Sequence, residues 1–350
     1  MNQTLGVGIL LVVVGGCMEG TYAIPMKYVP RWRWEHIWGA SCLAALLLVG
    51  WPVTFLTVPH LGTVFSEVGF RGLIWPTLFG LAWGAGSIFF GLGVEAVGLA
   101  VGVSVIMGLI AVVGSLLPLL IYHPEQFGST AGHLIALALA IMLFGIVLCG
   151  LAGSARDKAL QPRILDESAR ERATTKRSFR IGLLYCILSG LLSPLLNFAL
   201  ITGDSLRTAA AHHGASPLWA MNAVWILVFT VAYGLNIAYA CFVATKNKSF
   251  AELSAPGTRS HWGLAAAMGI LWAGGIVVYG VGVSRMGELG AYAAWPLLLI
   301  AAIAASNVSG ILIGEWKGTG RRPIALMTSA LVVLVFAALL LGFANRSVGS

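Results

Sequence analysis

The chain of 350 residues is 58% hydrophobic and only 10% charged, with a mean hydropathy of +0.90. Soluble globular domains carry about 25% charged residues, so the composition excludes a soluble fold, and the continuous apolar runs exclude the alternating strands of a membrane β-barrel. The net charge of +8 comes mostly from basic residues between these runs, which indicates membrane topology rather than nucleic-acid binding.

Ten apolar runs of about 20 residues are predicted to cross the membrane as helices, so the fold class is an all-α integral membrane protein. In chain order the runs are Leu5–Pro25, Trp38–Val58, Leu73–Leu92, Leu99–Ile121, Leu134–Leu151, Ile181–Ile201, Ala220–Thr245, Leu264–Val283, Ala291–Ile313 and Ile324–Phe343.

The first run contains a carboxylate. Glu19 lies in its C-terminal half next to Gly20, and we find no other charged residue well inside an apolar run. A charged group at the bilayer centre costs about 2.5–3.5 kcal/mol on insertion scales and usually has a function there. Because an apolar setting favours the protonated carboxyl, Glu19 is the predicted proton-coupling residue. The alternative is a structural Glu near the membrane face, hydrogen-bonded to a neighbouring helix.

An internal sequence repeat relates the third and fourth runs to the eighth and ninth. Residues 80–98 and 269–287, at an offset of 189, are identical at seven of 19 positions, with Trp83 and Trp272 in register. A unit of five spans that occurs twice must be inverted, since an odd number of crossings reverses the second copy. Inverted repeats of this kind build secondary transporters, whose sites lie near the midplane where the repeats meet.

One extended polar stretch, Ser154–Ser178, separates the two halves. We therefore predict a first five-helix repeat at 1–152, a charged cytoplasmic linker at 153–179 and a second five-helix repeat at 180–350. With ten spans, 17 of the 21 Lys and Arg residues fall on the linker's side. The positive-inside rule then places both termini in the periplasm.

The polar groups inside the runs are few and mostly uncharged. Amides and hydroxyls suit neutral, hydroxyl-rich ligands, and flat aromatic faces suit the C–H faces of sugars. Each amide alone serves equally well as a contact between helices. The predicted substrate-binding residues are Tyr22, Trp83, Ser87, Ser193, Asn197, Asn222, Trp272, Tyr279, Tyr292, Trp295 and Asn307.

Soluble-enzyme motifs are missing from the sequence, so an enzyme, a cofactor and a metal site are not expected. The five cysteines lie in apolar runs without C-x-x-C pairing, which predicts neither disulfides nor a metal site. The histidines fall in loops or at span ends and are predicted to be solvated. Six tryptophans near span ends are predicted to be interfacial anchors, namely Trp32, Trp34, Trp38, Trp75, Trp262 and Trp316.

The chain resembles a known family over nearly its whole length. The resembling residues are Ala23–Lys27, Trp32–Glu35, Phe79–Gly91, Gly108, Gly114 and Pro118, and, most specifically, Glu315-Trp316 with Gly320–Pro323. These motifs are similar to those of the L-rhamnose–proton symporter family, a branch of the drug/metabolite transporter superfamily. The resemblance implies ten spans in two inverted repeats and proton-coupled uptake of a deoxy-sugar or related monosaccharide across the bacterial inner membrane. We expect the Glu315–Arg322 motif to form a structural ion-pair turn.

Two departures from the family pattern leave the identity of the transported sugar open. Glu19 stands where rhamnose carriers have a small residue, and residues 287–295 are less polar than their counterparts. The expected partners are a small neutral sugar, protons and the lipid bilayer. The sequence leaves the oligomeric state open and is compatible with a monomer. The alternatives are an exporter of small neutral metabolites on the same fold and a non-transporting membrane receptor.

Overall fold

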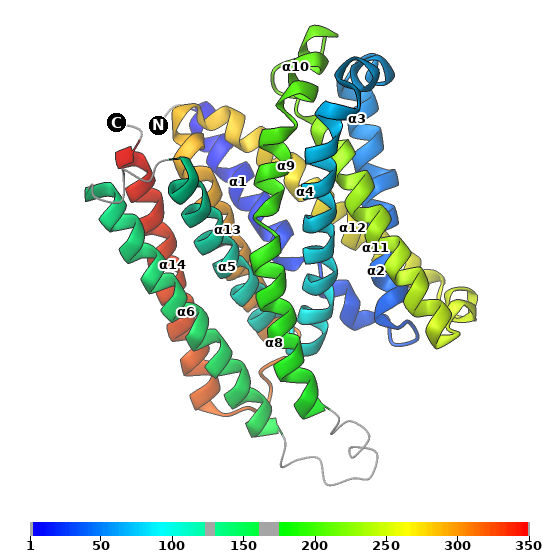
Figure 1. Cartoon of the computed structure of the whole chain (residues 1–350). Coiled ribbons are helices and arrows are strands. Elements are labelled where there is room, and N and C mark those ends of the chain that lie inside the picture. Colours follow the sequence, from blue (N-terminus) through cyan, green and yellow to red (C-terminus); the bar gives the residue numbers. More distant parts are fainter. Residues whose placement is uncertain (1–2, 123–129, 161–174, 349–350) are drawn as a thin grey trace. The chain divides into compact units, whose positions relative to one another are not determined.

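The computed structural model describes residues 3–122, 130–160 and 175–348. Its regular secondary structure within these ranges is helical, without a β-strand (Figure 1). By length and composition, eight of the described helices can cross a membrane. The all-α membrane class predicted from the apolar runs is therefore confirmed. Part of the predicted linker, residues 161–174, lies outside the described residues.

Helices make up most of the described residues. In chain order they are α1 (Gln3–Thr21), a 3₁₀ helix (Ile24–Tyr28), α2 (Trp34–Ala44), a π-helical turn (Ala45–Gly50), α3 (Trp51–Thr57), α4 (Leu61–Val97), α5 (Leu99–Tyr122), α6 (Thr130–Leu160), α8 (Thr175–Leu192), α9 (Leu195–Thr202), α10 (Asp204–His212), α11 (Asn222–Asn247), a 3₁₀ helix (Phe250–Ser254), α12 (Arg259–Met286), α13 (Glu288–Leu312) and α14 (Arg321–Val348).

Each of the ten predicted apolar runs contains helix. Two of them, in α5 and α13, have described apolar stretches of only Leu99–Gly114 and Leu297–Leu312, which are shorter than a full span. The count of ten spans therefore stays a prediction.

The second span, Trp34–Thr57, is one apolar helix with a π-helical turn in its middle. Pro52 is the second residue of α3, directly after this turn. Because proline has no backbone N–H, it cannot donate the usual bond to the residue four positions earlier. The π turn relieves this missing bond without ending the span.

The helices group into two compact units, and the chain passes between them several times. Unit 1 contains residues 1–21, 92–191 and 277–350, and unit 2 contains residues 22–91 and 192–276. Each unit takes elements from both halves of the chain. This grouping does not test the predicted repeats at 1–152 and 180–350, which stay a prediction.

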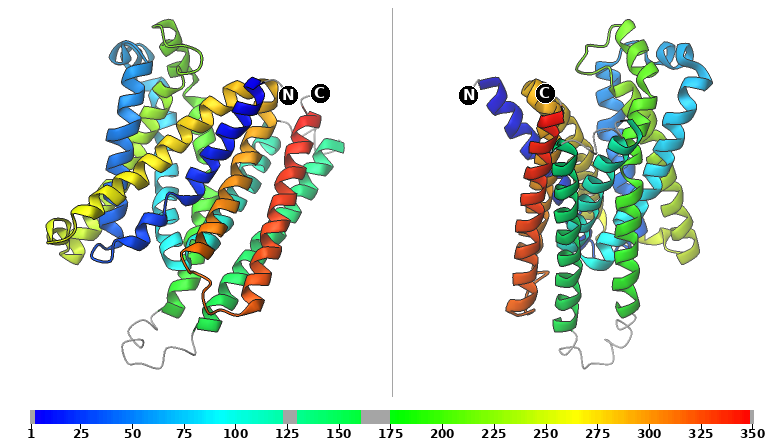
Figure 2. Two further views of the ribbon diagram at one scale, coloured as in Figure 1. Left: turned by 180° about the vertical axis from the view of Figure 1, so that it is seen from behind. Right: turned by 60° about the vertical axis from the view of Figure 1, so that its left-hand side comes forward.

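Within unit 1, α6 lies beside α14 along most of its length, and α1 packs against α13 (Figures 1 and 2). The contact of α1 with α13 depends on Gly16 and Gly20, where a Cβ atom would overlap the carbonyl oxygens of Leu298 and Ala302. Small residues four positions apart allow backbones to approach this closely in membranes. The start of α1 and the end of α14 lie at the same end of unit 1.

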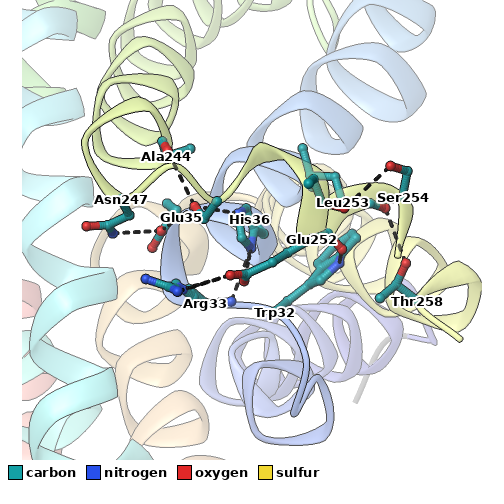
Figure 3. A network of polar contacts seen from close by, with 12 residues as sticks. Trp32, Arg33, Glu35, His36, Ala244, Asn247, Glu252, Leu253, Ser254 and Thr258 are labelled. Carbon is teal, nitrogen blue, oxygen red and sulfur yellow. Dashed lines mark hydrogen bonds and ion pairs between the residues drawn. The ribbon is translucent and has the colours of Figure 1, made fainter. Parts of the chain in front are cut away.

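Within unit 2, α2 packs against α11, and a polar network joins the segment before α2 to the segment after α11 (Figure 3). His36 Nε2 lies 3.0 Å from Ser249 Oγ, which donates to Glu35 Oε1 at 3.0 Å. Arg33 forms an ion pair with Glu252 at 3.1 Å. The network fixes the start of α2, where the backbone N–H of Arg33 donates to His36 Nδ1.

Several side chains are more buried than the sequence predicts. His36 and His261 are buried, so the prediction of solvated histidines is wrong for both. Of the predicted tryptophan anchors, Trp75 and Trp262 are exposed, and their interfacial role stays a prediction, whereas four are buried: Trp32, Trp34, Trp38 and Trp316. Polar partners and ring stacking inside the fold explain this difference, since Trp32 donates to the Glu252 carbonyl and Trp38 stacks on Trp34.

Candidate functional site

A small cavity lies inside unit 2, among α2, α4, α11 and α12. Ten residues form its wall: Tyr22, Trp38, Ser41, Cys42, Ala45, Ser87, Tyr233, Met268, Gly269 and Trp272. The space open to the centre of a water molecule is about 20 Å³, enough for about one water. Pockets that enclose small-molecule ligands are usually about 300–1,000 Å³, so the cavity in this conformation is too small for such a ligand.

The wall of the cavity is largely apolar and aromatic, and its polar side chains are uncharged. Four of its residues carry hydroxyl groups, namely Tyr22, Ser41, Ser87 and Tyr233, and none of the ten is ionic. A charged ligand buried here would lack a counter-charge in the wall, at a high desolvation cost. Hydroxyls can both donate and accept hydrogen bonds, so the wall matches a neutral ligand that carries hydroxyl groups of its own.

An aromatic cluster borders the cavity. The rings of Trp83 and Trp272 have centroids 5.6 Å apart, and Tyr233 lies 5.6 Å from Trp272. Phe229 completes the cluster at 5.4 Å from Trp272. Rings at these spacings pack in tilted or edge-on contacts that hold one another in place. Two rings of the cluster, Trp272 and Tyr233, belong to the wall, so the cavity offers aromatic surface to an apolar face of a ligand.

A buried amide holds Trp38 of the wall. Asn236 is fully buried, and its Oδ1 accepts a hydrogen bond from Trp38 Nε1 at 2.8 Å. Its Nδ2 donates to the carbonyl oxygens of Gly84 and Ala232 at 2.9 and 2.8 Å. One side chain thus connects α2, α4 and α11, and it sets the orientation of Trp38 in the wall.

Close packing of α2 against α12 keeps the cavity small. A Cβ atom at Gly269 would overlap the Ser41 carbonyl oxygen and the Ala45 backbone nitrogen. Only glycine permits this approach, since the other residues carry a Cβ. Entry of a ligand larger than water requires these two helices to separate or the surrounding side chains to turn.

Glu19, the predicted proton site, lies in α1 of unit 1. Its side chain is buried, and among the described residues its Oε1 has no hydrogen-bond partner. Burial of a carboxyl costs far more free energy in the ionised form than in the protonated form. The first segment of unit 1 ends at Thr21, and Tyr22 of the cavity wall is the next residue. Glu19 therefore stands three positions before the cavity wall in the sequence.

The structure brings together part of the predicted substrate-binding set. Tyr22, Ser87 and Trp272 line the cavity, and Trp83 packs on Trp272 beside it. Asn222 also lies in unit 2, but it donates to Thr57 Oγ1 at 2.8 Å and is not in the cavity wall.

The other predicted residues lie away from the cavity wall. Ser193 and Asn197 belong to unit 2, at the interruption between α8 and α9 and within α9. Three more belong to unit 1: Tyr279 packs edge-on against Trp295 at 6.1 Å, and Asn307 donates to Ser104 Oγ at 2.9 Å. The side chain of Tyr292 lies outside the described residues. Their roles in substrate binding stay predictions.

Sequence reasoning missed several residues of the wall. Trp38 was assigned to the interface because it opens an apolar run, and Ser41 and Cys42 follow it at helical spacing on the same side of α2. Tyr233 stands in the middle of an apolar run. The signal that could have found Trp38, Ser41 and Cys42 is this clustering of polar and aromatic residues on one helical face.

Comparison with known proteins gives the family. Residues 1–347 match the family described as L-rhamnose-proton symport protein. The chain belongs to this family. Two of its similar relatives, both named L-rhamnose-proton symporter, come from Salmonella typhi, 25% identical over 99% of this chain and 100% of the relative, and from Cronobacter sakazakii, 26% identical over 98% of both chains. No solved structure matches.

Membership of the L-rhamnose-proton symport protein family makes the chain a proton-coupled sugar transporter and not an enzyme. It agrees with the resemblance seen in the motifs and with a multi-pass protein of a bacterial inner membrane.

Proposed function

We propose that this chain takes up L-rhamnose or a closely related neutral monosaccharide together with protons across the inner membrane. The cavity of unit 2 is the sugar-binding site, with Trp272 and its aromatic neighbours under the ring and the hydroxyls of Tyr22, Ser41 and Ser87 toward the sugar hydroxyls. Glu19 is the group that binds the proton.

The observation that carries the proposal is the uncharged, hydroxyl-bearing and aromatic wall of the cavity. It supports a neutral sugar over a sugar phosphate, an acid sugar or an organic ion, because these would need buried ionic partners. The small volume of the cavity supports a transport cycle in which the site opens to admit the sugar and closes around it.

The proton role of Glu19 has separate support. The side chain is buried in α1, its Oε1 lacks a hydrogen bond among the described residues, and three residues further along the chain stands Tyr22 of the cavity wall. Release and uptake of a proton at Glu19 change the charge directly beside the segment that leads into the sugar site.

The proposal includes ten spans in two inverted repeats and both termini in the periplasm. Supporting observations are the repeated sequence around Trp83 and Trp272, the excess of Lys and Arg in alternate loops, and the position of the start of α1 and the end of α14 at one end of unit 1. Cysteine labelling of the termini in intact cells tests the orientation.

The direct test uses purified protein in liposomes with an imposed pH gradient, outside acidic. We expect labelled L-rhamnose to accumulate above its external concentration, and an uncoupler to abolish accumulation while leaving exchange of internal for external sugar intact. A panel of unlabelled monosaccharides then gives the specificity by competition.

Accumulation that is insensitive to the uncoupler would contradict proton coupling. Transport only in the outward direction would favour the exporter, and binding without any flux would favour the receptor. Absence of binding across hexoses, deoxyhexoses and pentoses would contradict a sugar substrate.

A further inference from the structure

One residue, Gly98, separates α4 from α5, and it lies in unit 1. Its φ of +89° belongs to the left-handed region that glycine adopts without strain. α4 ends at Val97 and α5 begins at Leu99, so a helix C-terminus with unpaired carbonyls and a helix N-terminus with unpaired N–H groups stand side by side.

A carboxylate from a distant loop covers the N-terminus of α5. The backbone N–H groups of Leu99 and Ala100 donate to Glu315 Oε1 and Oε2 at 2.7 and 3.2 Å. The Glu315 side chain is 3% exposed. It comes from the turn between α13 and α14, and Gly310 near the end of α13 lies so close that a Cβ there would be 3.0 Å from Glu315 Oε2.

A guanidinium from α6 covers the C-terminus of α4. Arg156 Nη2 donates to the Val97 carbonyl oxygen at 2.7 Å, and its Nη1 lies 3.9 Å from Glu315 Oε2. The guanidinium carbon is 5.5 Å from the ring centre of Trp316, in a cation–π arrangement. The Arg156 side chain is 8% exposed.

The two charges match the helix ends that they cover. A helix N-terminus carries partial positive charge and attracts a carboxylate, whereas a helix C-terminus attracts a cation. The Glu315 carboxylate of the Glu315–Arg322 motif is directed at α5 and at Arg156, a residue that the sequence alone places in the charged linker. The ion-pair turn expected within this motif stays a prediction. We name Arg156 and Glu315 the Gly98 clamp.

The clamp and the cavity belong to different units but share one helix. Both clamp residues lie in unit 1, and all ten residues of the cavity wall lie in unit 2. α4 carries Ser87 of the wall and ends at Val97, whose carbonyl Arg156 holds. A disturbed clamp thus leaves the sugar contacts in place and changes how the end of α4 is held.

We propose that Arg156 and Glu315 are positioning residues for the translocation step, which hold the α4–α5 interruption rigid so that movement of the sugar site is transmitted along α4. This inference rests on the transport function proposed above. Loss of the Arg156–Glu315 pair is therefore expected to lower the turnover of transport and to leave the affinity for the sugar unchanged.

The test compares Glu315→Gln, Arg156→Lys and the exchange Arg156→Glu with Glu315→Arg. Glu315→Gln removes the charge, and Arg156→Lys removes the fork that reaches Val97 and Glu315 together. The exchange keeps an ion pair but presents each charge to the wrong helix end. We expect all three to bind L-rhamnose with a Kd within about twofold of wild type, and to lower turnover in sugar exchange at least about tenfold.

The matched control is Arg207→Gln, which breaks the exposed ion pair of Arg207 with Asp204 in unit 2. Exposed pairs contribute little, so turnover should match wild type. Wild-type turnover in the clamp variants, full activity of the exchanged pair, or loss of affinity in parallel with turnover would each overturn the positioning role. Failure of wild type to transport any sugar would instead refute the proposed function.

Hydrogen exchange tests the clamp without reference to transport. Glu315→Gln should speed exchange of the Leu99 and Ala100 amides at least about tenfold and leave amides in α2 of unit 2 unchanged. Unchanged protection at Leu99 and Ala100 would show that the carboxylate does not hold this helix end, and the clamp would be rejected on that result alone.

Discussion

Trp83 and Trp272, which occupy equivalent positions 189 residues apart in the repeated sequence, pack against each other with ring centroids 5.6 Å apart and ring planes at 33°. Trp272 is in the wall of the cavity, and Trp83 is buried behind it. Contact between two equivalent residues is what a pseudo-two-fold axis between α4 and α12 would produce, and it joins the repeat to the proposed sugar site.

Replacing Trp272 by alanine is expected to raise the KM for L-rhamnose about tenfold, because the flat surface under the sugar is lost. Tenfold corresponds to about 1.4 kcal/mol of binding free energy. Trp272→Phe should retain most of the affinity, and Trp83→Ala should have a smaller effect of about threefold, because Trp83 only supports Trp272. The concentration dependence of uptake in liposomes measures all three.

Trp75→Ala is the matched control, because this tryptophan is 57% exposed and lies on the surface of α4. Its KM should equal that of wild type. An equal rise in KM for Trp75→Ala and Trp272→Ala would mean that loss of any tryptophan disturbs the protein, and the cavity would lose its support as the sugar site.

Glu19→Gln is expected to abolish accumulation driven by a pH gradient while exchange of internal for external sugar continues. Glutamine is nearly the same size and mimics the protonated carboxyl, so the sugar site remains but no proton is carried. Sugar-induced proton uptake, recorded with a pH dye in weakly buffered liposomes, should fall below detection. Glu67→Gln, at an exposed carboxylate paired with His213, should transport as wild type does. Uphill uptake by Glu19→Gln would assign the proton to another group.

The sequence predicts some of this architecture and not the rest, for physical reasons. Hydrophobicity is enough to predict the apolar helices. The repeat is enough to recognise Trp83 and Trp272 as equivalent positions in the sequence. Ser41 and Cys42 share one face of α2 with Trp38, but that pattern alone does not assign the face to ligand binding, because small polar residues in apolar runs serve packing as often as binding. Arg156 could not be recognised, because its burial arises only when α6, the α4–α5 interruption and the loop of Glu315 come together.

Asn236→Ala is expected to lower both stability and sugar affinity. The change leaves the N–H of Trp38 and the carbonyl of Gly84 without their partner inside the membrane, and an unsatisfied buried group costs about 1–3 kcal/mol. Thermal unfolding in detergent should show the loss. Asn222→Ala is the control, because its bond to Thr57 is only partly buried, and a smaller loss is expected. Equal stability of the two variants would mean that Asn236 does not organise the wall.

Cys42 provides a chemical probe of the cavity. Its side chain is 4% exposed and belongs to the wall, so a sugar in the site should shield it from a small maleimide. In a variant that retains only Cys42, saturating L-rhamnose should slow alkylation at least about fivefold, followed by mass spectrometry. A variant that retains only Cys241, which is exposed, should react at the same rate with and without sugar. A sugar-independent rate at Cys42 would place the bound sugar elsewhere.

The packing of α1 on α13 gives a prediction about the helix that carries Glu19. Alanine at Gly20 would place its Cβ against the carbonyl oxygen of Ala302, and overpacking of this kind costs about 1–3 kcal/mol. Because α1 would have to move away from α13, Gly20→Ala should lower the temperature of thermal unfolding and reduce proton-driven uptake together. Gly280→Ala is the control within a helix, since a Cβ there has no neighbour within 4 Å, and alanine stabilises helices relative to glycine by about 1 kcal/mol. If Gly20→Ala were as stable and as active as Gly280→Ala, the close contact between α1 and α13 would not be required for holding Glu19.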